Sequence, residues 1–467
     1  MMRIRQKTPL QLLAASFAAL AMVATASAKV IGTNVIAKPL TRERIATLPQ
    51  SEQQAWLDYL DRAEKQKAID KQTLADEQKA AGNMAPKHAP SRHGMFPPPA
   101  AAGAPQPPRP AGPRPRGEHP AAWWSSDEAI KAAQNAMSWQ VADGGWSKNI
   151  DTERLARAAG DFYDADNENA FPDAADFDKA NDPSWHYIAT LDNDATWTQI
   201  RFLAHVATAL IAAHREADAA PIRTSVARGI EYLLNSQYPN GGWPQVWPLE
   251  GGYHDAITIN DDAMTHAVEI LHDVATGAEN YRFLPAELAH RAAPAAARGI
   301  ACLLKLQIVE NGMKTAWAQQ YDPLTLEPTS ARNYEMAALT SDESFPIIEF
   351  LMSLPNPTLD QIAAVHAACA WFQKVEIFGY RYGSGDFFAD HRSAEGRKLA
   401  AVAGAGPIWA RYYQIGTDKP IFGDRDKTIH DDVNELSLER RNGYGWYNTE
   451  GVELLSKYKT WAQKYPK

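Results

Sequence analysis

One pattern returns along the chain and constrains its fold more than any other feature. An apolar helical stretch ends in glutamine, and a glycine-containing turn and an aromatic residue follow it. The copies read "QVADGGW" from Gln140, "QYPNGGW" from Gln237, "QIVENGMKTAW" from Gln307 and, more faintly, "QKVEIFGY" from Gln373. Repeats roughly 65 to 100 residues apart, each long enough for two helices, indicate helical hairpins that stack or close into a ring. We therefore predict an all-α fold, an α/α toroid, with long loops and short irregular strands at the active-site end.

Most of each repeat motif is predicted to be structural. The glycines suit the left-handed backbone conformation found at helix C-termini. The tryptophans Trp146 and Trp243 are then packing residues after a helix stop. A ring adds a shared end, where the loops after each helix converge and can build a site.

The first residues indicate export. Arg3, Arg5 and Lys7 precede a short apolar run and a small-residue cleavage site that ends at Ala28, which is typical of a secretory signal peptide. We expect residues 1–28 to be removed and the mature protein to be secreted or periplasmic in a Gram-negative bacterium. No later stretch is long and apolar enough for a membrane span.

Composition divides the remaining chain into three predicted segments. Residues 29–83 are charged and partly helical, and we assign them no chemistry. Residues 84–122 hold 12 of the 31 prolines and are typical of a linker. Residues 123–467, rich in Trp, Tyr and Phe, are long enough for one large core and form the predicted catalytic domain. The cysteines, Cys302 and Cys369, are too few for a disulfide scaffold, and whether they pair is open.

The charge of the chain restricts its partners. The formal net charge is −9, and loss of the basic signal peptide makes the mature chain more acidic. Such a protein gains nothing electrostatically from nucleic acid, so we expect no nucleic-acid partner. To bind any polyanion it needs local cations or a bound metal ion. We expect a monomer.

Carboxylate and amide groups gather at two predicted helix starts. "TLDNDAT" contains Asp192, Asn193 and Asp194, and "TINDDAM" contains Asp261 and Asp262. One such residue suffices for an N-cap, so the surplus favours a second role, although capping remains an alternative. Oxygen ligands without cysteine or clustered histidine favour calcium over zinc.

These motifs, together with "AWAQQYDPLTLEPTSARNYEMAALTSDES" and "ARYYQIGTDKPIFGDRD", resemble in the same order those of polysaccharide lyase family 10, the pectate lyases. The resemblance covers about residues 125–465. The chain departs from the family at one position, because Asp194 stands where the first acidic motif usually has glycine. An extra carboxylate therefore lies near the expected calcium site.

The resemblance implies calcium-dependent β-elimination of polygalacturonate, the backbone of pectin. A base removes the C5 proton, the glycosidic oxygen on C4 leaves, and a 4,5-unsaturated oligogalacturonide forms. The positions that match the family's functional residues are Arg332 as Brønsted base, Arg411 and Arg425 on substrate carboxylates, and Asp192 and Asp261, with their neighbours Asn193 and Asp262, at Ca²⁺. We expect Lys314 to be a further cation that binds the substrate.

The role implied for Arg332 conflicts with general expectation, because an arginine side chain with a pKa above about 12 is normally charged. A neutral guanidine needs desolvation and nearby positive charge. Alternatively, Arg332 stays charged and stabilises the enolate while another base acts.

Three other readings come from different classes of protein. The repeat also resembles the Gln-Trp repeat of triterpene cyclases, but their D-x-D-D tetrad does not occur here. A glycoside hydrolase would use Asp192 and Asp261 as its carboxylate pair. A non-catalytic carbohydrate-binding protein would offer aromatic platforms, although most aromatic residues are expected in the core. The candidate platforms are Trp185, Tyr321, Trp409 and Tyr413.

Overall fold

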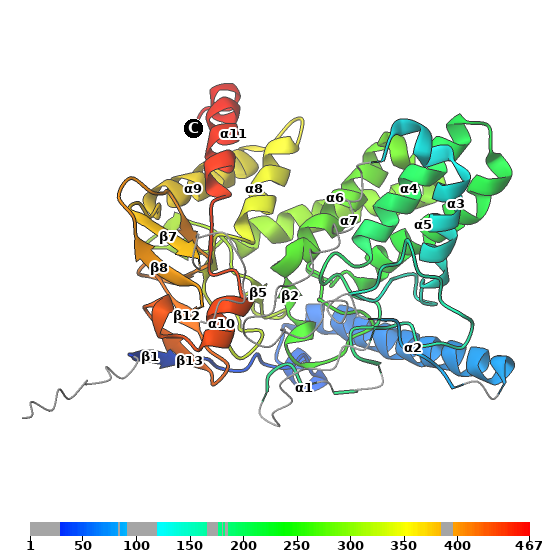
Figure 1. Cartoon of the computed structure of the whole chain (residues 1–467), viewed down its shortest axis with the longest axis horizontal. Helices are drawn as coiled ribbons and strands as arrows, with labels where there is room; N and C mark the ends of the chain where they lie inside the picture. The colour runs from blue at the N-terminus through cyan, green and yellow to red at the C-terminus, as the bar shows by residue number, and fades with distance from the viewer. Residues whose placement is uncertain are drawn as a thin grey trace, which may run out of the picture.

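The computed structural model describes residues 29–82, 85–90, 119–165, 176–179, 181–182, 185–383 and 396–467. The predicted signal peptide and most of the predicted linker lie outside these residues. As predicted, the described part is mostly helical (Figure 1). None of its helices combines the length and apolar character needed to cross a membrane. The α-helices are α1 (Arg42–Ile45), α2 (Gln50–Ala81), α3 (Asp127–Ser138), α4 (Trp197–Ala212), α5 (Glu216–Ser236), α6 (Ala263–Thr276), α7 (Ala286–Leu306), α8 (Ser344–Ser353), α9 (Leu359–Lys374), α10 (Leu438–Gly443) and α11 (Gly451–Lys464).

The helices pack in two rows. Helices α3, α5, α7 and α9 contact one another in that order, and α4, α6 and α8 form a second row. The rows are joined within hairpins, since α4 packs on α5, α6 on α7 and α8 on α9, while α11 covers α8 and α9. The hairpins therefore stack, which is one of the two arrangements that the repeats predict.

The repeated glutamine is the joint between neighbouring hairpins. In the first three copies its side-chain amide donates one hydrogen bond to the turn that follows it and another to a carbonyl in the next hairpin. Because these carbonyls are buried, an unmade bond would leave a polar group unsatisfied. The bonds run from Gln140 to Gly144 (2.8 Å) and Ser225 (2.9 Å), from Gln237 to Gly241 (3.1 Å) and Ala295 (2.9 Å), and from Gln307 to Thr315 (2.9 Å) and Ala364 (2.9 Å).

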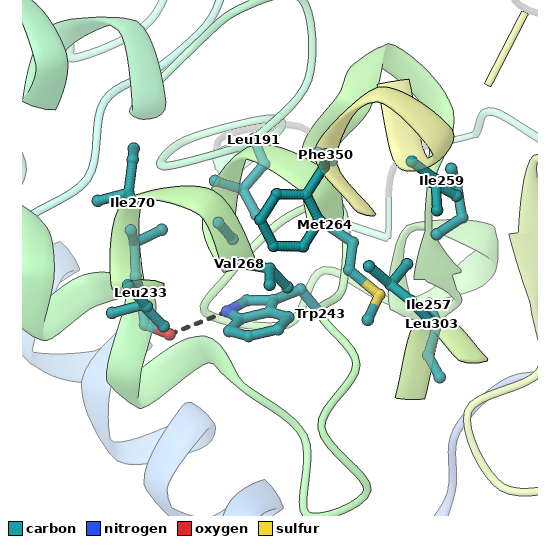
Figure 2. Close-up of a cluster of buried hydrophobic side chains, with 14 of the residues drawn as sticks. Leu191, Leu233, Trp243, Ile257, Ile259, Met264, Val268, Ile270, Leu303 and Phe350 are labelled. Carbon is teal, nitrogen blue, oxygen red and sulfur yellow. Dashed lines mark hydrogen bonds between the residues drawn. The ribbon is translucent and has the colours of Figure 1, made fainter. Parts of the chain in front are cut away.

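The repeated tryptophan closes the same turn, as predicted for a packing residue. Figure 2 shows Trp243 in a cluster of buried apolar side chains, where its indole N–H donates to the carbonyl of Leu233 at 2.9 Å. Trp146 and Trp317 make the same bond to their own preceding helices, and all are fully buried. The aromatic thus anchors the end of each inner helix in one continuous core.

Short antiparallel strands lie below α8 and α9 in the view of Figure 1, with α10 among them. They form the sheets β1–β13–β12 and β11–β10–β6 and the pairs β2–β5, β3–β4, β7–β8 and β9–β14. Their bounds are β1 (Val30–Thr33), β2 (Ile257–Thr258), β3 (Val309–Glu310), β4 (Met313–Lys314), β5 (Gln320–Tyr321), β6 (Leu339–Thr340), β7 (Tyr380–Gly383), β8 (Lys398–Ala401), β9 (Trp409–Ala410), β10 (Tyr412–Gln414), β11 (Lys419–Pro420), β12 (Phe422–Gly423), β13 (Thr428–His430) and β14 (Tyr447–Asn448).

The N-terminal segment folds onto the helical part of the molecule. Tyr59 of α2 donates to the carbonyl of Ser236 at 2.9 Å, and the rings of Trp56 and Tyr59 lie 5.1 and 4.8 Å from that of Tyr238. These contacts bury one face of α2 at the end of α5. The segment boundaries at residues 83 and 122 remain predictions.

The proposed aromatic platforms are not on the surface. Their large apolar rings pack within the core, so they cannot offer a stacking face to a sugar. The residues concerned, Trp185, Tyr321, Trp409 and Tyr413, are all buried. The observation that favoured a non-catalytic carbohydrate-binding protein is therefore wrong.

Candidate active site

The two acidic motifs meet in space. The backbone N–H of Asn193 donates to Oδ2 of Asp261 at 3.2 Å, and the side chains of Asp192 and Asp261 lie within hydrogen-bonding reach of each other. Asp192 is fully buried, whereas Asn193 is exposed. Two helix starts about one repeat apart thus face one another, as their pattern suggested.

These acids do not act as helix caps. The residues that precede α4 and α6, Thr196 and Asp262, make no side-chain capping hydrogen bond. Instead, the backbone turns through left-handed conformations, with φ of 48° at Asn193, 51° at Asp261 and 58° at Asp262. Such conformations cost on the order of 1–3 kcal/mol each and are concentrated at functional sites. The capping interpretation is wrong, and the strained turns indicate that the placement of these side chains has another purpose.

A buried lysine neutralises one member of the acid pair. Lys148 contacts Asp192 with 2.5 Å between Nζ and Oδ2, and it lies 3.1 Å above the ring of Tyr187. Burial alone would raise the pKa of Asp192, but Lys148 and Arg332 outweigh it and hold that pKa below its ordinary value. Burial and the charge of Asp192 raise the pKa of Asp261 well above its ordinary value. The site therefore holds one ionised carboxylate, Asp192, and one carboxyl group, Asp261, whose ionisation is disfavoured.

The same pair fits a divalent cation. Oδ1 of Asp192 is buried and has no hydrogen-bond partner, although a buried carboxylate oxygen normally has one. Beside it stands Asp261, whose ionisation is opposed by a like charge. A hard cation with oxygen ligands would satisfy the first group and relieve the repulsion on the second. The residues that would hold it are Asp192 and Asp261, with Asn193 and Asp262 adjacent.

Further acids surround Arg411. Its guanidinium contacts Asp342 and the side-chain oxygen of Asn260, each at 3.1 Å, and it also pairs with Glu343. Burial and the charges of Glu343 and Asp342 raise the pKa of Asp262 to about 8. Arg411 is therefore placed near the acid pair, where it is already paired with carboxylates, and its role on the substrate stays a prediction.

Arg332 lies on a tight turn between β5 and β6, and its carbonyl accepts from the N–H of Glu335 at 2.9 Å. The guanidinium is 3.6 Å from Asp178 and 3.5 Å from Glu335. Burial alone would lower the pKa of Arg332, but the neighbouring tyrosines, Tyr334 foremost, and Glu335 outweigh it and raise that pKa well above its ordinary value. The surroundings described here thus stabilise the charged guanidinium, which is the opposite of what a neutral base needs.

Arg425 lies beside Arg332 through a shared loop contact. The side chain of Asn333 donates to the carbonyl of Arg425 at 2.9 Å, and the Arg425 guanidinium lies 4.9 Å from the ring centre of Tyr334. Glu439 contacts the same guanidinium at 3.3 Å. The two arginines, about ninety residues apart in the chain, therefore border one region, and the substrate contact of Arg425 stays a prediction.

Lys314 forms no contact of this kind with the site residues in the part of the chain that the structure describes. It lies at the end of the β3–β4 hairpin, and β4 packs on α9. In the described part of the chain its side chain forms no hydrogen bond or ion pair with the acids or arginines of the site. The structure gives no support to its prediction as a substrate-binding residue.

A buried network behind Arg332 was missed from the sequence. Asp178 accepts hydrogen bonds from the hydroxyls of Tyr187 (2.8 Å) and Tyr253 (2.7 Å), and Nε2 of His254 is 3.4 Å away. Asp178, His186 and His254 lie close enough together to hold a metal ion. No motif marks Asp178. Lys148, in contrast, is part of the quoted stretch "QVADGGWSKNID" and was detectable as the cation nearest the first glycine turn.

Comparison with known proteins gives two concordant results. The model of the family described as pectic acid lyase matches residues 140–455. A family 10 polysaccharide lyase from Cellvibrio cellulosa is 30% identical with a TM-score of 0.59, over 74% of this chain and 96% of that one. A mutant of a lyase with the same description, in complex with trigalacturonic acid, is 29% identical with the same TM-score, over 74% and 98%. No curated protein matches the chain.

Proposed function

The chain belongs to the pectic acid lyase family, and from this premise we propose that it cleaves polygalacturonate by calcium-dependent β-elimination. The observation that carries the proposal is the buried Asp192 carboxylate, with an unpartnered oxygen, beside Asp261 and within the electrostatic reach of Arg332. The product is a 4,5-unsaturated oligogalacturonide. A relative solved with trigalacturonic acid supports this substrate class.

Electrostatics supports the calcium requirement. Acidic side chains outnumber cationic ones around the site, and the substrate is itself a polyanion. Without a divalent cation, such a site would repel the polymer. Bound at Asp192 and Asp261, calcium would neutralise the uronate carboxylate next to C5 and so favour loss of the C5 proton. The groups are Asp178, Asp192, Asp261, Asp262, Glu335, Asp342, Glu343 and Glu439 against Lys148, Arg332, Arg411 and Arg425.

The chain's own cations orient the sugar. Arg411 and Arg425 bind uronate carboxylates, a task that suits the planar, bidentate guanidinium. Because each is already paired with a glutamate, Glu343 or Glu439, substrate carboxylates join or replace existing ion pairs rather than meet a bare charge. This arrangement keeps both arginines in place before the polymer arrives.

Arg332 is the proposed Brønsted base at C5. In the structure, acids on both sides of it favour the charged form. A cation held by Asp192 and Asp261 would neutralise these two acids, which also interact with Arg332. The pKa of Arg332 would then fall toward the range in which a neutral guanidine is accessible. The competing role, a charged guanidinium that stabilises the enolate, is separated from this one by the lysine substitution considered in the Discussion.

We propose the ring architecture and the export of the chain together with this activity. Two stacked rows of hairpins support an α/α toroid whose loop end carries the site. A polymer too large to enter a cell requires an exported enzyme, which supports cleavage near Ala28 and a secreted or periplasmic destination. That the enzyme acts as a monomer is part of the proposal.

The proximity of Asp192 and Asp261 disfavours a hydrolase. Hydrolases hold their two carboxyl groups roughly 5 to 9.5 Å apart, on opposite sides of the bond they cleave. Here the two side chains lie within hydrogen-bonding reach of each other.

The test follows the products of purified protein on polygalacturonate. New reducing ends and the ultraviolet absorbance of the conjugated uronide should rise together. Reducing ends without absorbance would establish hydrolysis instead. Binding with neither signal would establish a non-catalytic protein.

A further inference from the structure

The first residues of the described chain run along the loops that carry two of the site arginines. We call residues 29–40 the N-terminal strap. Its strand β1 pairs with β13, and the backbone N–H of Asn34 donates to the carbonyl of Lys427 at 2.8 Å, two residues beyond Arg425. Ser330, two residues before Arg332, donates its hydroxyl to the carbonyl of Val35. The strap is thus fastened on both sides of the site loops.

Asn34 lies at the centre of these contacts. Its side-chain nitrogen is within hydrogen-bond distance of three carbonyls of the Arg332 turn: 3.1 Å from Arg332, 3.0 Å from Asn333 and 3.2 Å from Glu335. Its side-chain oxygen accepts from the N–H of Val35 at 2.9 Å, which fixes the amide orientation. Asn34 is only 7% exposed, so water does not readily replace these bonds.

The strap lies outside the range matched by the pectic acid lyase family model. That match runs from residue 140 to residue 455. The contacts of Asn34 with the Arg332 turn are therefore supplied from outside the matched range.

We propose that Asn34 is a positioning residue for catalysis: by sharing its two side-chain N–H groups among three carbonyls of the Arg332 turn, it holds the Arg332 guanidinium at the reacting carbon. The inference rests on the proposed function of Arg332. A turn fastened at its backbone keeps its side chain within the narrow range that proton transfer requires, and a displacement of about 1 Å can cost on the order of 100-fold in rate. The strap then contributes to the geometry of the active site, although it contains none of the proposed catalytic residues.

The test compares Asn34→Ala with Asn135→Ala in the full mature chain. Asn135 is a matched control because it is also buried, 6% exposed, and donates its side-chain amide to one carbonyl, that of Glu153, at 2.8 Å. Both variants lose a buried asparagine, but only Asn34 touches the Arg332 turn. Asn34→Ala should lower kcat about tenfold or more with KM within about threefold, whereas Asn135→Ala should keep kcat near wild type.

A second variant gives a signature that lost stability would not. Asn34→Asp has nearly the same shape, but an ionised carboxylate cannot donate to the three carbonyls. Once protonated, it regains one donor. Its kcat relative to wild type should therefore recover toward acidic pH, and that of Asn34→Ala should not.

The outcomes separate this inference from the proposed function. An inactive wild-type chain would refute the proposed function itself. With an active wild type, the positioning role is overturned if folded Asn34→Ala keeps half or more of kcat, or loses no more than Asn135→Ala. It is also overturned if both Asn34 variants fail to fold, since the residue would then be purely structural.

Discussion

At the scale of single residues, the chemistry depends on how carboxylates are distributed between Arg332 and Asp192. Arg332 has Asp178 and Glu335 beside it, while Asp192 has Lys148 and an unpartnered oxygen. The surroundings of Arg332 and of Asp192 each hold opposite charges in close contact and largely buried. Removal of one charge therefore changes the electrostatic energy of its neighbours.

Substitution of Arg332 tests whether it is a base or a charged stabiliser. Arg332→Ala and Arg332→Lys should both lose nearly all kcat with little change in KM, because lysine keeps the charge but not the reach, the planar fork or the pKa. Steady-state kinetics on polygalacturonate measures this. Arg411→Ala and Arg425→Ala are the controls and should act mainly on KM. The base role fails if Arg332→Lys keeps a tenth or more of kcat, about 1.4 kcal/mol of barrier.

Isosteric amides test the acid pair independently of activity. Asp192→Asn and Asp261→Asn should each abolish turnover and remove the rise in melting temperature that Ca²⁺ gives the wild type. Without calcium, Asp261→Asn should melt no lower than wild type, because it relieves repulsion from Asp192. Asp194→Asn, at an exposed neighbour, should keep the calcium response. A full calcium shift in either pair variant would remove that residue from the ligand set.

His254 should make stability depend on pH. Burial alone would lower the pKa of His254, but Glu250 and Asp178 outweigh it and raise that pKa above its ordinary value. The stabilisation from a raised histidine pKa is fully present below the unfolded value, about 6.5, and is lost as pH rises through the folded value. The difference in melting temperature between wild type and His254→Gln should therefore shrink from about pH 6 upward. The exposed control His290→Gln should show no such trend, and a flat difference for His254→Gln would refute the assignment.

At the scale of elements, the repeat joints carry the architecture. Gly241 has φ of 96°, and a Cβ there would lie 2.3 Å from the carbonyl oxygen of Arg298 in α7. Glycine is thus required both by backbone conformation and by the close approach of the next hairpin.

Matched glycine substitutions test this joint. Gly241→Ala should lower the free energy of unfolding by several times the loss in Gly312→Ala. Gly312 also has a positive φ, 79°, but open space where a Cβ would lie, so only backbone strain of roughly 1 kcal/mol applies. Denaturant unfolding of both variants gives the comparison. Equal losses would mean that the close approach to Arg298 is not what fixes Gly241.

The same joints explain how much of the fold was predictable. A helix end marked by Gln, Gly and Trp is a local sequence signal. The hairpins and the buried Trp243 could therefore be predicted from the sequence alone. The position of the strap could not be predicted, because β1 pairs with β13 almost four hundred residues away in the chain. The sequence of β1, "VIGT", has no feature that indicates which strand it pairs with.

At the scale of the whole molecule, the site is assembled from segments far apart in the chain. Asp192 and Asp261 could be paired in advance because each heads a helix one repeat from the other. Asp178 could not, because its role depends on the groups that the fold sets against Arg332. Lys148 lies in a recognisable motif, but its pairing with Asp192 depends on the fold in the same way. The left-handed turns before α4 and α6 were also hidden, since the sequence there is equally typical of N-caps.

The measurement that tests the central claim most directly is turnover of polygalacturonate, followed by ultraviolet absorbance, after exhaustive chelation and during Ca²⁺ titration at constant ionic strength. The acid pair and the anionic substrate predict that chelation reduces the rate to background. They also predict that Ca²⁺ restores it along a saturable curve, which Na⁺ at equal ionic strength does not reproduce. Full turnover after chelation would contradict the account.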